Sequence, residues 1–338
     1  MEKKIRALVM LTKRQPPSSR LRFVACREEF LKHGIEMTFM PIPSNPVGRL
    51  KLFLQMKQHD VVIIQKKTSF KRYELTFIRY LNPNIIFDYD DAVMFHELEH
   101  GKTLMGKNVI KFLRTIKYCR AVVAGNNFLA EFARPNCPNV FVLPTPIDME
   151  RYRLKDYSEK KDKVTIGWIG VSGNLKYLKR LEPVLKNISE RYPHTVLKII
   201  SNDSIKLNGV KIEFKKWRLE DEIEDLRSID IGIMPIDNSL WARGKCGYKI
   251  LQYMGVGVPV VASPVGINVE FIKHGENGFL ATSDEDWLLS LKSLIRNPDM
   301  RKTFGMKGRQ ILEERYSLRR YAEKYSSIIK RYDKISIG

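Results

Sequence analysis

The chain has 338 residues, of which 43% are hydrophobic, enough to form the cores of two domains of ordinary size. It carries 59 Lys and Arg against 38 Asp and Glu, a net charge of +21, which favours anionic partners such as phosphorylated substrates, anionic lipids or nucleic acid. Nucleic acid is not expected, because the chain shows no helix-turn-helix, zinc-ligand or stacking-rich sheet motif.

The cysteines and the hydropathy pattern indicate a compartment. Cys26, Cys119, Cys137 and Cys246 have neither disulfide-framework nor metal-ligand spacing, so we expect them to be reduced and the protein to be cytoplasmic. No apolar run approaches the ~18 residues of a membrane span, and the first residues lead directly into a strand, so we expect neither a spanning helix nor a signal peptide.

Strands and helices alternate through the first half of the chain. We expect strands at 5–11, 37–40, 61–65, 85–87, 121–124 and 140–143, and helices at 20–33, 47–57, 71–81, 107–119 and 127–134. This spacing implies right-handed βαβ units and a parallel sheet. Ligands should then bind beyond the carboxyl ends of the strands.

Two segments of this half, 66–80 and 107–119, are basic and amphipathic. Residues 1–155 carry 27 Lys and Arg against 14 Asp and Glu, whereas the remainder carries 32 against 24. These segments therefore favour contact with an anionic membrane, where each basic residue near the surface contributes about 1 kcal/mol. The alternative is that both helices simply cover the sheet with their apolar sides and leave their charges in water.

A second α/β series follows a charged segment at 151–163 that reads as a linker. We expect strands at 164–169, 195–200, 210–214, 229–234 and 260–262, and helices at 175–191, 219–227, 248–254 and 318–332, with others starting at Asp284 and Pro298. The two series predict two α/β domains.

The stretch from 241 to 278 is the strongest candidate for an anion site. A glycine-rich basic turn with Arg243 and Lys245 precedes a helix, and a buried strand then runs into a tight turn at 263–266. Such turns direct backbone N–H groups and the positive end of a helix dipole at one point. Lys245 and Lys249 are four residues apart and could add charge there. The alternative is that they are ordinary solvated lysines.

The order helix, Gly-x-Pro-Val-Val-Ala-Ser, Gly266, Glu270 and Gly275-x-Asn-Gly278 resembles the donor half of the retaining glycosyltransferases of family 4 (glycosyl transferases group 1). A weaker resemblance extends from residue 1 to about residue 333. It implies the GT-B fold, an α/β architecture of two Rossmann-like, doubly wound parallel-sheet domains facing across a cleft. The acceptor domain would be 1–155, the nucleotide-sugar donor domain 156–317, and 318–338 a helix crossing back to the first domain.

A transferase of this kind must neutralise a departing diphosphate. We expect the turn at 170–174, with Gly170, Ser172 and Gly173, and the nearby Lys176 to do so. The family usually places an arginine and a lysine five apart here; Lys176 matches the lysine, but Val171 stands where the arginine would be. Lys249, Lys245 or Arg243 would then supply the missing charge.

The family also carries two glutamates eight apart, and the matching positions here are Gly244 and Gln252. Gln252 can still hydrogen-bond ribose hydroxyls through its amide. The resemblance places Trp217 over the nucleotide base and Glu270 at the sugar or ribose, although a capping tryptophan and a helix-start acid are equally good interpretations. The expected donor site comprises Gly170, Ser172, Gly173, Lys176, Trp217, Arg243, Lys245, Gln252, Ser263, Gly266 and Glu270.

The acceptor side is expected at the strand ends of the first domain. There Ser19 and Arg20 lie in the loop after the first strand, and Asp88, Asp90 and Asp91 end the fourth. Asp90 or Asp91 would orient the acceptor or steady the sugar, while Asp88 fits a structural role better; Lys249 completes the expected catalytic set, and His96 joins the acceptor set. Paired aspartates can bind Mg²⁺, but members of the GT-B family generally need no metal, so none is expected.

The sequence thus predicts a retaining, peripherally membrane-bound glycosyltransferase on the cytoplasmic side. It would transfer a hexose-type sugar from a UDP- or GDP-sugar to a lipid-linked or saccharide acceptor, as in the synthesis of surface polysaccharide or glycolipid, without a further cofactor. A soluble acceptor is one alternative. Because neither glutamate is present, a non-catalytic relative that binds sugar nucleotides or glycans is another.

Overall fold

The computed structural model describes residues 4–12, 17–97, 103–158 and 162–333. The chain forms two compact units. Unit 1 comprises Met1–Pro146, Ser239–Cys246 and Tyr316–Gly338, and unit 2 comprises Ile147–Asn238 and Gly247–Arg315. Unit 1 therefore takes in the C-terminal helix and also a short segment from the middle of the chain.

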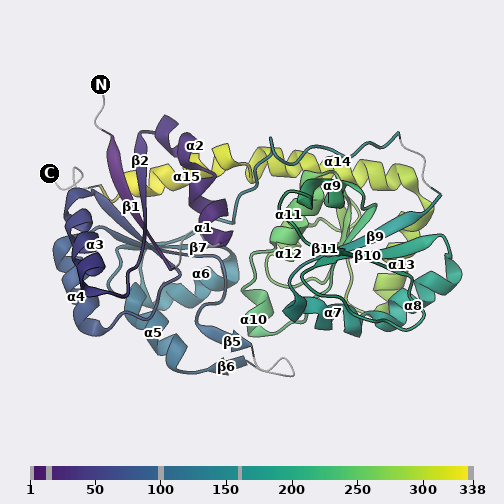
Figure 1. Ribbon diagram of the computed structural model, residues 1–338, viewed down its shortest axis with the longest axis horizontal. Helices are drawn as coiled ribbons and strands as arrows, with labels where there is room; N and C mark the ends of the chain where they lie inside the picture. Colours follow the sequence, from purple (N-terminus) through teal and green to yellow (C-terminus); the bar gives the residue numbers. More distant parts are fainter. Residues whose placement is uncertain (1–3, 13–16, 98–102, 159–161, 334–338) are drawn as a thin grey trace. The chain divides into compact units, whose positions relative to one another are not determined.

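Unit 1 contains a six-stranded sheet of parallel neighbouring strands, in the order β2-β1-β3-β4-β7-β8 (Figure 1). Its strands are β1 (Ile5–Leu11), β2 (Ile35–Pro41), β3 (Val61–Gln65), β4 (Ile85–Tyr89), β7 (Ala121–Ala124) and β8 (Val140–Val142). A separate antiparallel pair, β5 (Phe95–Glu97) and β6 (Thr103–Met105), was not expected from the sequence. β3 and β4 are buried along their whole length, and apart from Gln65 and Asp88 their residues are hydrophobic, as burial on both sides of the sheet requires.

Helices cover both sides of this sheet. They are α1 (Pro17–Ser19), the π-helical turn η1 (Arg20–Val24), α2 (Arg27–Lys32), α3 (Pro46–Gln58), α4 (Arg72–Leu81), α5 (Lys107–Ile116), α6 (Asn127–Ala133), the 3₁₀ turn η3 (Arg134–Asn136), α10 (Leu240–Arg243) and α15 (Leu318–Lys330). Successive strand residues point to opposite sides. Accordingly Leu8 and Val62 pack with α3 to α6, while Val9 and Ile63 pack with α2 and α15.

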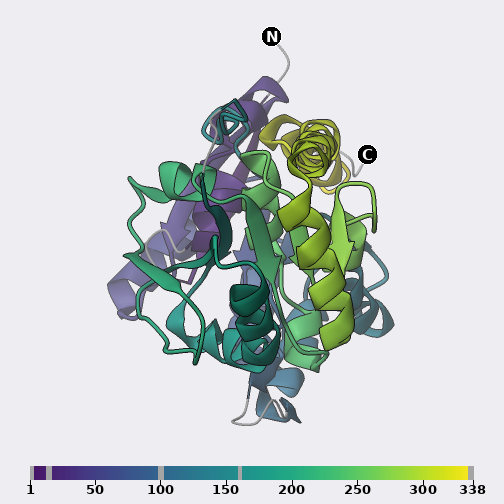
Figure 2. The ribbon, with the colours of Figure 1, turned by 90° about the vertical axis from the view of Figure 1, so that its right-hand side faces the viewer.

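Unit 2 repeats this arrangement with the strand order β11-β10-β9-β12-β13-β14. The strands are β9 (Val164–Ile169), β10 (Thr195–Ser201), β11 (Ile212–Lys216), β12 (Ile231–Met234), β13 (Val260–Ala262) and β14 (Gly278–Leu280). The helices are η4 (Ser172–Asn174), α7 (Leu175–Arg180), α8 (Glu182–Arg191), α9 (Glu222–Arg227), α11 (Tyr248–Gly255), α12 (Asn268–Phe271), α13 (Asp284–Arg296) and α14 (Pro298–Arg315). Figure 2 looks onto this unit, with α14 nearly end-on.

Two helices expected to be continuous are interrupted. The expected helix at 20–33 is broken at Ala25 and Cys26. The segment before the break, η1, is a π-helical turn, in which each hydrogen bond encloses one more residue than in an α-helix. Arg22 and Phe23 in this turn are both completely buried. The expected helix at 175–191 is broken at Leu181, and the new helix begins at Glu182 with Pro183 in its first turn.

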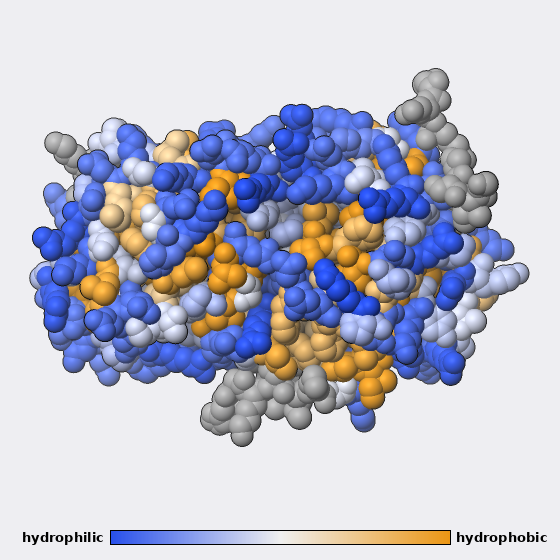
Figure 3. Space-filling view, turned by 180° about the vertical axis from the view of Figure 1, so that it is seen from behind, coloured by the Kyte–Doolittle hydropathy of each residue, from blue (hydrophilic) through white to orange (hydrophobic). Residues whose placement is uncertain are grey.

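Hydrophilic residues cover most of the face shown in Figure 3, with hydrophobic residues exposed between them. Among the described residues, no helix combines the length and the apolar character needed to cross a lipid bilayer.

Candidate functional site

A buried ion pair anchors the carboxyl end of β4 in unit 1. The Arg22 guanidinium donates from Nε to Asp88 Oδ1 at 2.9 Å and from Nη2 to Oδ2 at 2.6 Å, and both side chains are fully buried. Burial opposes the charge of Arg22, but Asp88 outweighs it and raises the pKa of the guanidinium. Arg22 therefore holds Asp88 inside the fold, while the place of Asp88 in the expected acceptor set stays a prediction.

The next two carboxylates share one lysine. Lys66, the residue directly after β3, places its Nζ 2.9 Å from Asp90 Oδ1 and 2.5 Å from Asp91 Oδ2. Burial raises the pKa of Asp90, but the charges of Lys66 and Arg22 reverse this and leave it below its usual value. Partial burial and the neighbouring Asp90 carboxylate raise the pKa of Asp91. The expected catalytic aspartates are thus adjacent but have different protonation behaviour.

Gly125 and Gly244 pack so closely against Asp90 and Ala92 that neither position has room for a Cβ atom. A Cβ on Gly125, at the end of β7, would lie 2.7 Å from Asp90 Cα. A Cβ on Gly244 would lie 2.5 Å from Ala92 Cβ, so this position accommodates no glutamate without a shift of the chain. The amide of Asn126 donates to the carbonyls of Arg243 at 3.2 Å and Lys245 at 3.1 Å. These expected donor-site residues consequently belong to unit 1.

The other residues expected on the acceptor side differ in burial and in the element to which they belong. Ser19 is fully buried and its hydroxyl donates to the Gln65 side chain. Arg20 begins η1 and is half-buried. His96 lies in β5, but its side chain is outside what the structure describes.

In unit 2, Lys249 reaches the turn expected to bind phosphate. Its Nζ lies 4.5 Å from the ring centre of Trp168, which is buried at the end of β9. A Cβ on Gly170 would lie only 2.5 Å from this Nζ, so the ammonium group sits directly beside the first residue of the turn. The structure therefore brings Lys249 and Gly170 together, as expected from the missing charge at Val171.

The rest of that turn is held by a neighbouring strand end. Asn202 accepts from the backbone N–H of Ser172 at 2.9 Å and donates to its hydroxyl at 3.0 Å. A Cβ on Gly173 would meet no atom within 4 Å, so the turn is open at this residue. Lys176 extends over the ring of Tyr177, with its Nζ 5.4 Å from the ring centre.

Gln252 and Trp217 belong to one hydrogen-bonded group. The buried Gln252 amide donates to the Tyr152 hydroxyl at 3.1 Å, and that hydroxyl donates to Glu222 at 3.0 Å. The Trp217 indole N–H donates to the other oxygen of Glu222 at 3.0 Å, and 39% of the tryptophan is exposed. Contact of either residue with a nucleotide stays a prediction.

Hydrogen bonds within the fold hold the second expected turn, at 263–266. The Ser263 hydroxyl accepts from the N–H of Ile236 at 3.1 Å, and Asn268 donates to the Ser263 carbonyl at 2.9 Å. Gly266 has a φ of 56°, a conformation that favours glycine. Glu270 is exposed in the first turn of α12.

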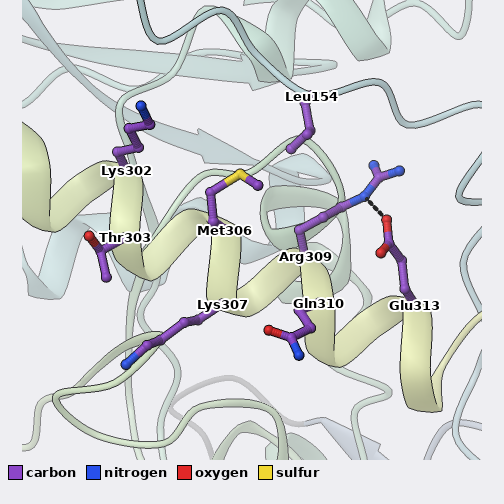
Figure 4. Close-up of a pocket in the computed structure, with 8 residues that line it drawn as sticks. All are labelled: Leu154, Lys302, Thr303, Met306, Lys307, Arg309, Gln310 and Glu313. Carbon is purple, nitrogen blue, oxygen red and sulfur yellow. Dashed lines mark hydrogen bonds and ion pairs between the residues drawn. The ribbon is translucent and has the colours of Figure 1, made fainter.

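A pocket of about 630 Å³ lies elsewhere in unit 2, over α14 (Figure 4). It is lined by Leu154, Lys302, Thr303, Met306, Lys307, Arg309, Gln310 and Glu313, none of which was expected in a site. In Figure 4 Arg309 points toward Glu313, with Nε 2.7 Å from its carboxylate. Within the described residues, no three His, Cys, Asp or Glu side chains are grouped as metal ligands.

Comparisons with known proteins agree with this architecture. Residues 163–297 match the family model described as glycosyl transferases group 1. Over 132 residues the chain is 28% identical to an uncharacterized glycosyltransferase of Methanocaldococcus jannaschii, and this match covers 38% of the chain and 31% of the relative. The chain thus spans about a third of the length of that curated relative.

Two solved structures are similar over nearly their whole length. HepE of Anabaena, in complex with UDP and glucose, superposes with a TM-score of 0.71 at 14% identity, covering 96% of this chain and 99% of that one. WaaG, a glycosyltransferase involved in lipopolysaccharide biosynthesis, gives a TM-score of 0.66 at 15% identity, with the same coverage of 96% and 99%. The fold is that of the GT-B glycosyltransferases. The fold class predicted from the sequence is confirmed.

Sequence reasoning missed several residues of this GT-B chain that support the candidate site. They are Lys66, Tyr152, Trp168 and Glu222. A polar residue directly after the buried strand β3 was a usable signal for Lys66, because that is where ligand-side residues of a parallel sheet lie. Trp168 contacts Lys249, and Tyr152 contacts Glu222 and Gln252; these partners are far apart in sequence, so no local pattern reveals them.

Proposed function

We propose that this chain is a nucleotide-sugar-dependent glycosyltransferase that retains the configuration of the transferred sugar, as family 4 enzymes do. Unit 2 binds a UDP- or GDP-hexose, and unit 1 binds a saccharide or lipid-linked acceptor. The acceptor oxygen bonds to the anomeric carbon while the bond from that carbon to the diphosphate breaks. The bonding electron pair leaves with the diphosphate, which also takes up the hydroxyl proton. No metal is required in this proposal.

The observation that carries the proposal is the position of Lys249 beside Gly170. Within the part of unit 2 that matches glycosyl transferases group 1, it puts a cation against an open glycine turn. A charge-assisted hydrogen bond from lysine to a phosphate oxygen contributes about 1.5–3 kcal/mol. HepE, which shares the fold, binds UDP and UDP-glucose, and this supports a uridine nucleotide as the first donor to test.

Thermal-shift measurements with UDP, GDP, ADP and TDP and their sugars would identify the donor. A ligand bound only by the folded protein at about 100 times its Kd adds about 2.7 kcal/mol of apparent stability. Transfer or slow hydrolysis of the stabilising nucleotide sugar would then separate an enzyme from a binding protein. Stabilisation without either reaction, with every acceptor tried, would favour the non-catalytic alternative.

Replacing Lys249 by alanine is expected to raise the donor KM or lower turnover at least tenfold, because the charge beside the glycine turn is lost. Steady-state kinetics with the identified donor would measure this. Lys186→Ala is a matched control, since Lys186 is a solvent-exposed lysine of the same unit whose partner is Glu190. Unchanged kinetics in the Lys249 variant would remove this residue from the donor site.

We also propose that unit 1 binds the cytoplasmic face of an anionic membrane, where a lipid-linked acceptor would be found. Helices α3 and α4 pack together through Phe53 and Phe77, whose ring centres are 5.0 Å apart. They expose an α3–α4 surface formed by Val47, Leu50, Leu54, Tyr73, Phe77 and Tyr80. Exposed basic residues on the same helices, among them Lys51, Arg72 and Arg79, and Lys71 directly before α4, complement anionic lipid.

Replacing Leu54 by serine is expected to lower binding to vesicles containing anionic lipid about fivefold, since roughly 1 kcal/mol of apolar burial is lost. Co-sedimentation with anionic and neutral vesicles would measure this. Leu289→Ser is the control, because Leu54 and Leu289 are each 54% exposed but belong to different units. Equal binding of all three proteins to anionic vesicles would exclude Leu54 from the membrane contact, and absence of binding by the wild type would indicate a soluble acceptor instead.

A further inference from the structure

Lys66 has an unusual backbone conformation. Its φ of 57° makes it the one non-glycine residue with positive φ in the described part of the chain. This left-handed conformation costs about 1–2 kcal/mol for a residue with a side chain. Its N–H nevertheless donates to the Asp88 carbonyl at 2.9 Å, which fixes the turn at the end of β3. Strain of this kind persists where the surrounding structure requires it, and it often marks functional sites.

The Lys66 ammonium group has three close partners. Its Nζ donates to Ser18 Oγ at 3.0 Å and to Asp91 Oδ2 at 2.5 Å, and it forms an ion pair with Asp90 Oδ1 at 2.9 Å. All three partners belong to the protein, so the position of the ammonium group is set by its neighbours.

The side chains of Asp90 and Asp91 differ in how far they are exposed to solvent. The Asp90 side chain is 3% exposed, its Oδ2 accepts from the Thr145 hydroxyl at 3.4 Å, and Gly125 closes over its backbone. The Asp91 side chain is 39% exposed. A ligand can thus reach Asp91 and not Asp90.

We infer that Lys66 is a positioning residue, which neutralises Asp90 inside the fold and holds Asp91 outward as the carboxylate that accepts a hydrogen bond from the acceptor hydroxyl. This inference rests on the proposed function. It chooses between the two aspartates that the sequence left open, and it adds a residue that the sequence did not indicate.

The charges facing Asp91 give the inference a measurable consequence. They are Asp90, Lys66 and Lys245; the Asp90 carboxylate raises the pKa of Asp91, and the two lysines lower it. An opposite charge at this range typically lowers a carboxyl pKa by about 1–3 units. Removing the charge of Lys66 should therefore raise the pKa of Asp91, while an arginine at this position should preserve it.

The test compares Lys66→Met, Lys66→Arg and the adjacent control Lys67→Met with the wild type. Carbon-13 NMR titration of aspartate-labelled protein, with the Asp91 signal assigned by Asp91→Asn, measures the pKa of Asp91 beside Lys66 without any assay of activity. We expect the Asp91 midpoint to rise by about 1 unit or more in Lys66→Met and to stay within ~0.5 unit in the other two. An unchanged midpoint in Lys66→Met, or an equal shift in Lys66→Arg, would overturn the inference.

Steady-state kinetics provide a second test of the inference. Asp91→Asn is expected to lower kcat roughly 30-fold or more with little change in donor KM, because an acceptor contact is lost. Lys66→Met should move the acidic limb of the kcat profile to higher pH, since Asp91 must be ionised to accept the hydrogen bond; a uniform loss at every pH would contradict a positioning role. Absence of transfer by the wild type would refute the proposed function, while the titration would still decide whether Lys66 holds Asp91.

Discussion

Replacing Arg22 by methionine is expected to lower the free energy of unfolding of unit 1 by about 3–5 kcal/mol, because Asp88 would be left buried without its partner. The guanidinium also donates to the Leu143 carbonyl at 2.9 Å and lies 5.3 Å from the ring centre of Tyr321 in α15. Its loss should therefore loosen the contact of α15 with the sheet. Denaturant unfolding, followed by a probe in unit 1, would measure the change.

The same variant should depend on pH in a defined direction. Burial raises the pKa of Asp88 and Arg22 lowers it, so removal of Arg22 raises the pKa further. A carboxyl whose pKa is higher in the folded state binds more protons there, and stability then falls as pH rises between the unfolded and folded pKa values. The deficit of Arg22→Met should accordingly be smaller in acid than at neutral pH.

Two comparisons make this prediction specific. Arg22→Met combined with Asp88→Leu should recover much of the loss, since no unpaired buried charge remains. Arg320→Met, which removes an exposed pair with Glu323, should change the unfolding free energy by no more than about 0.5 kcal/mol. A small effect of Arg22→Met alone would mean that Asp88 takes up a proton or reaches water at little cost.

The strands of this fold could be predicted because burial on both sides of a parallel sheet leaves a plain signal. The bounds of β1 and β3 agree with the expected ranges 5–11 and 61–65, where nearly every residue is apolar. The break before α2 could not be predicted in this way. It exists because Arg22 turns inward to meet Asp88, a partner 66 residues away, and helical periodicity carries no information on such a pair.

The positions of the candidate-site residues could likewise be predicted only in part from the sequence. Lys249, Lys245 or Arg243 was expected to supply the charge missing at Val171, and the structure places the Nζ of Lys249 beside Gly170. The positions of Arg243 and Lys245 could not be foreseen, since they follow from the hydrogen bonds of Asn126 to their carbonyls. Gly244 shows why a family comparison alone is insufficient: its contact with Ala92 leaves no space for the glutamate that the family carries.

Replacing Gly170 by alanine is expected to lower donor affinity roughly 10–100-fold, the loss of about one charge-assisted hydrogen bond. The new methyl group would lie 2.5 Å from Lys249 Nζ and 2.7 Å from Trp168 Cη2. Trp168 is buried and cannot move far, whereas the end of the lysine can, so the ammonium group should be displaced from the turn. Titration with the nucleotide diphosphate, followed by calorimetry or thermal shift, would measure the affinity.

The double variant Gly170→Ala, Lys249→Ala decides whether displacement of the lysine is the cause. If it is, the second substitution should add little to the first, because both remove the same contact, and the effects on affinity should be strongly non-additive. Additive losses would instead show that the methyl group acts separately from Lys249, by distorting a turn whose Gly170, Ser172 and Asn174 N–H groups already donate within the fold. Such a result would leave Lys249 with a separate role in binding the donor.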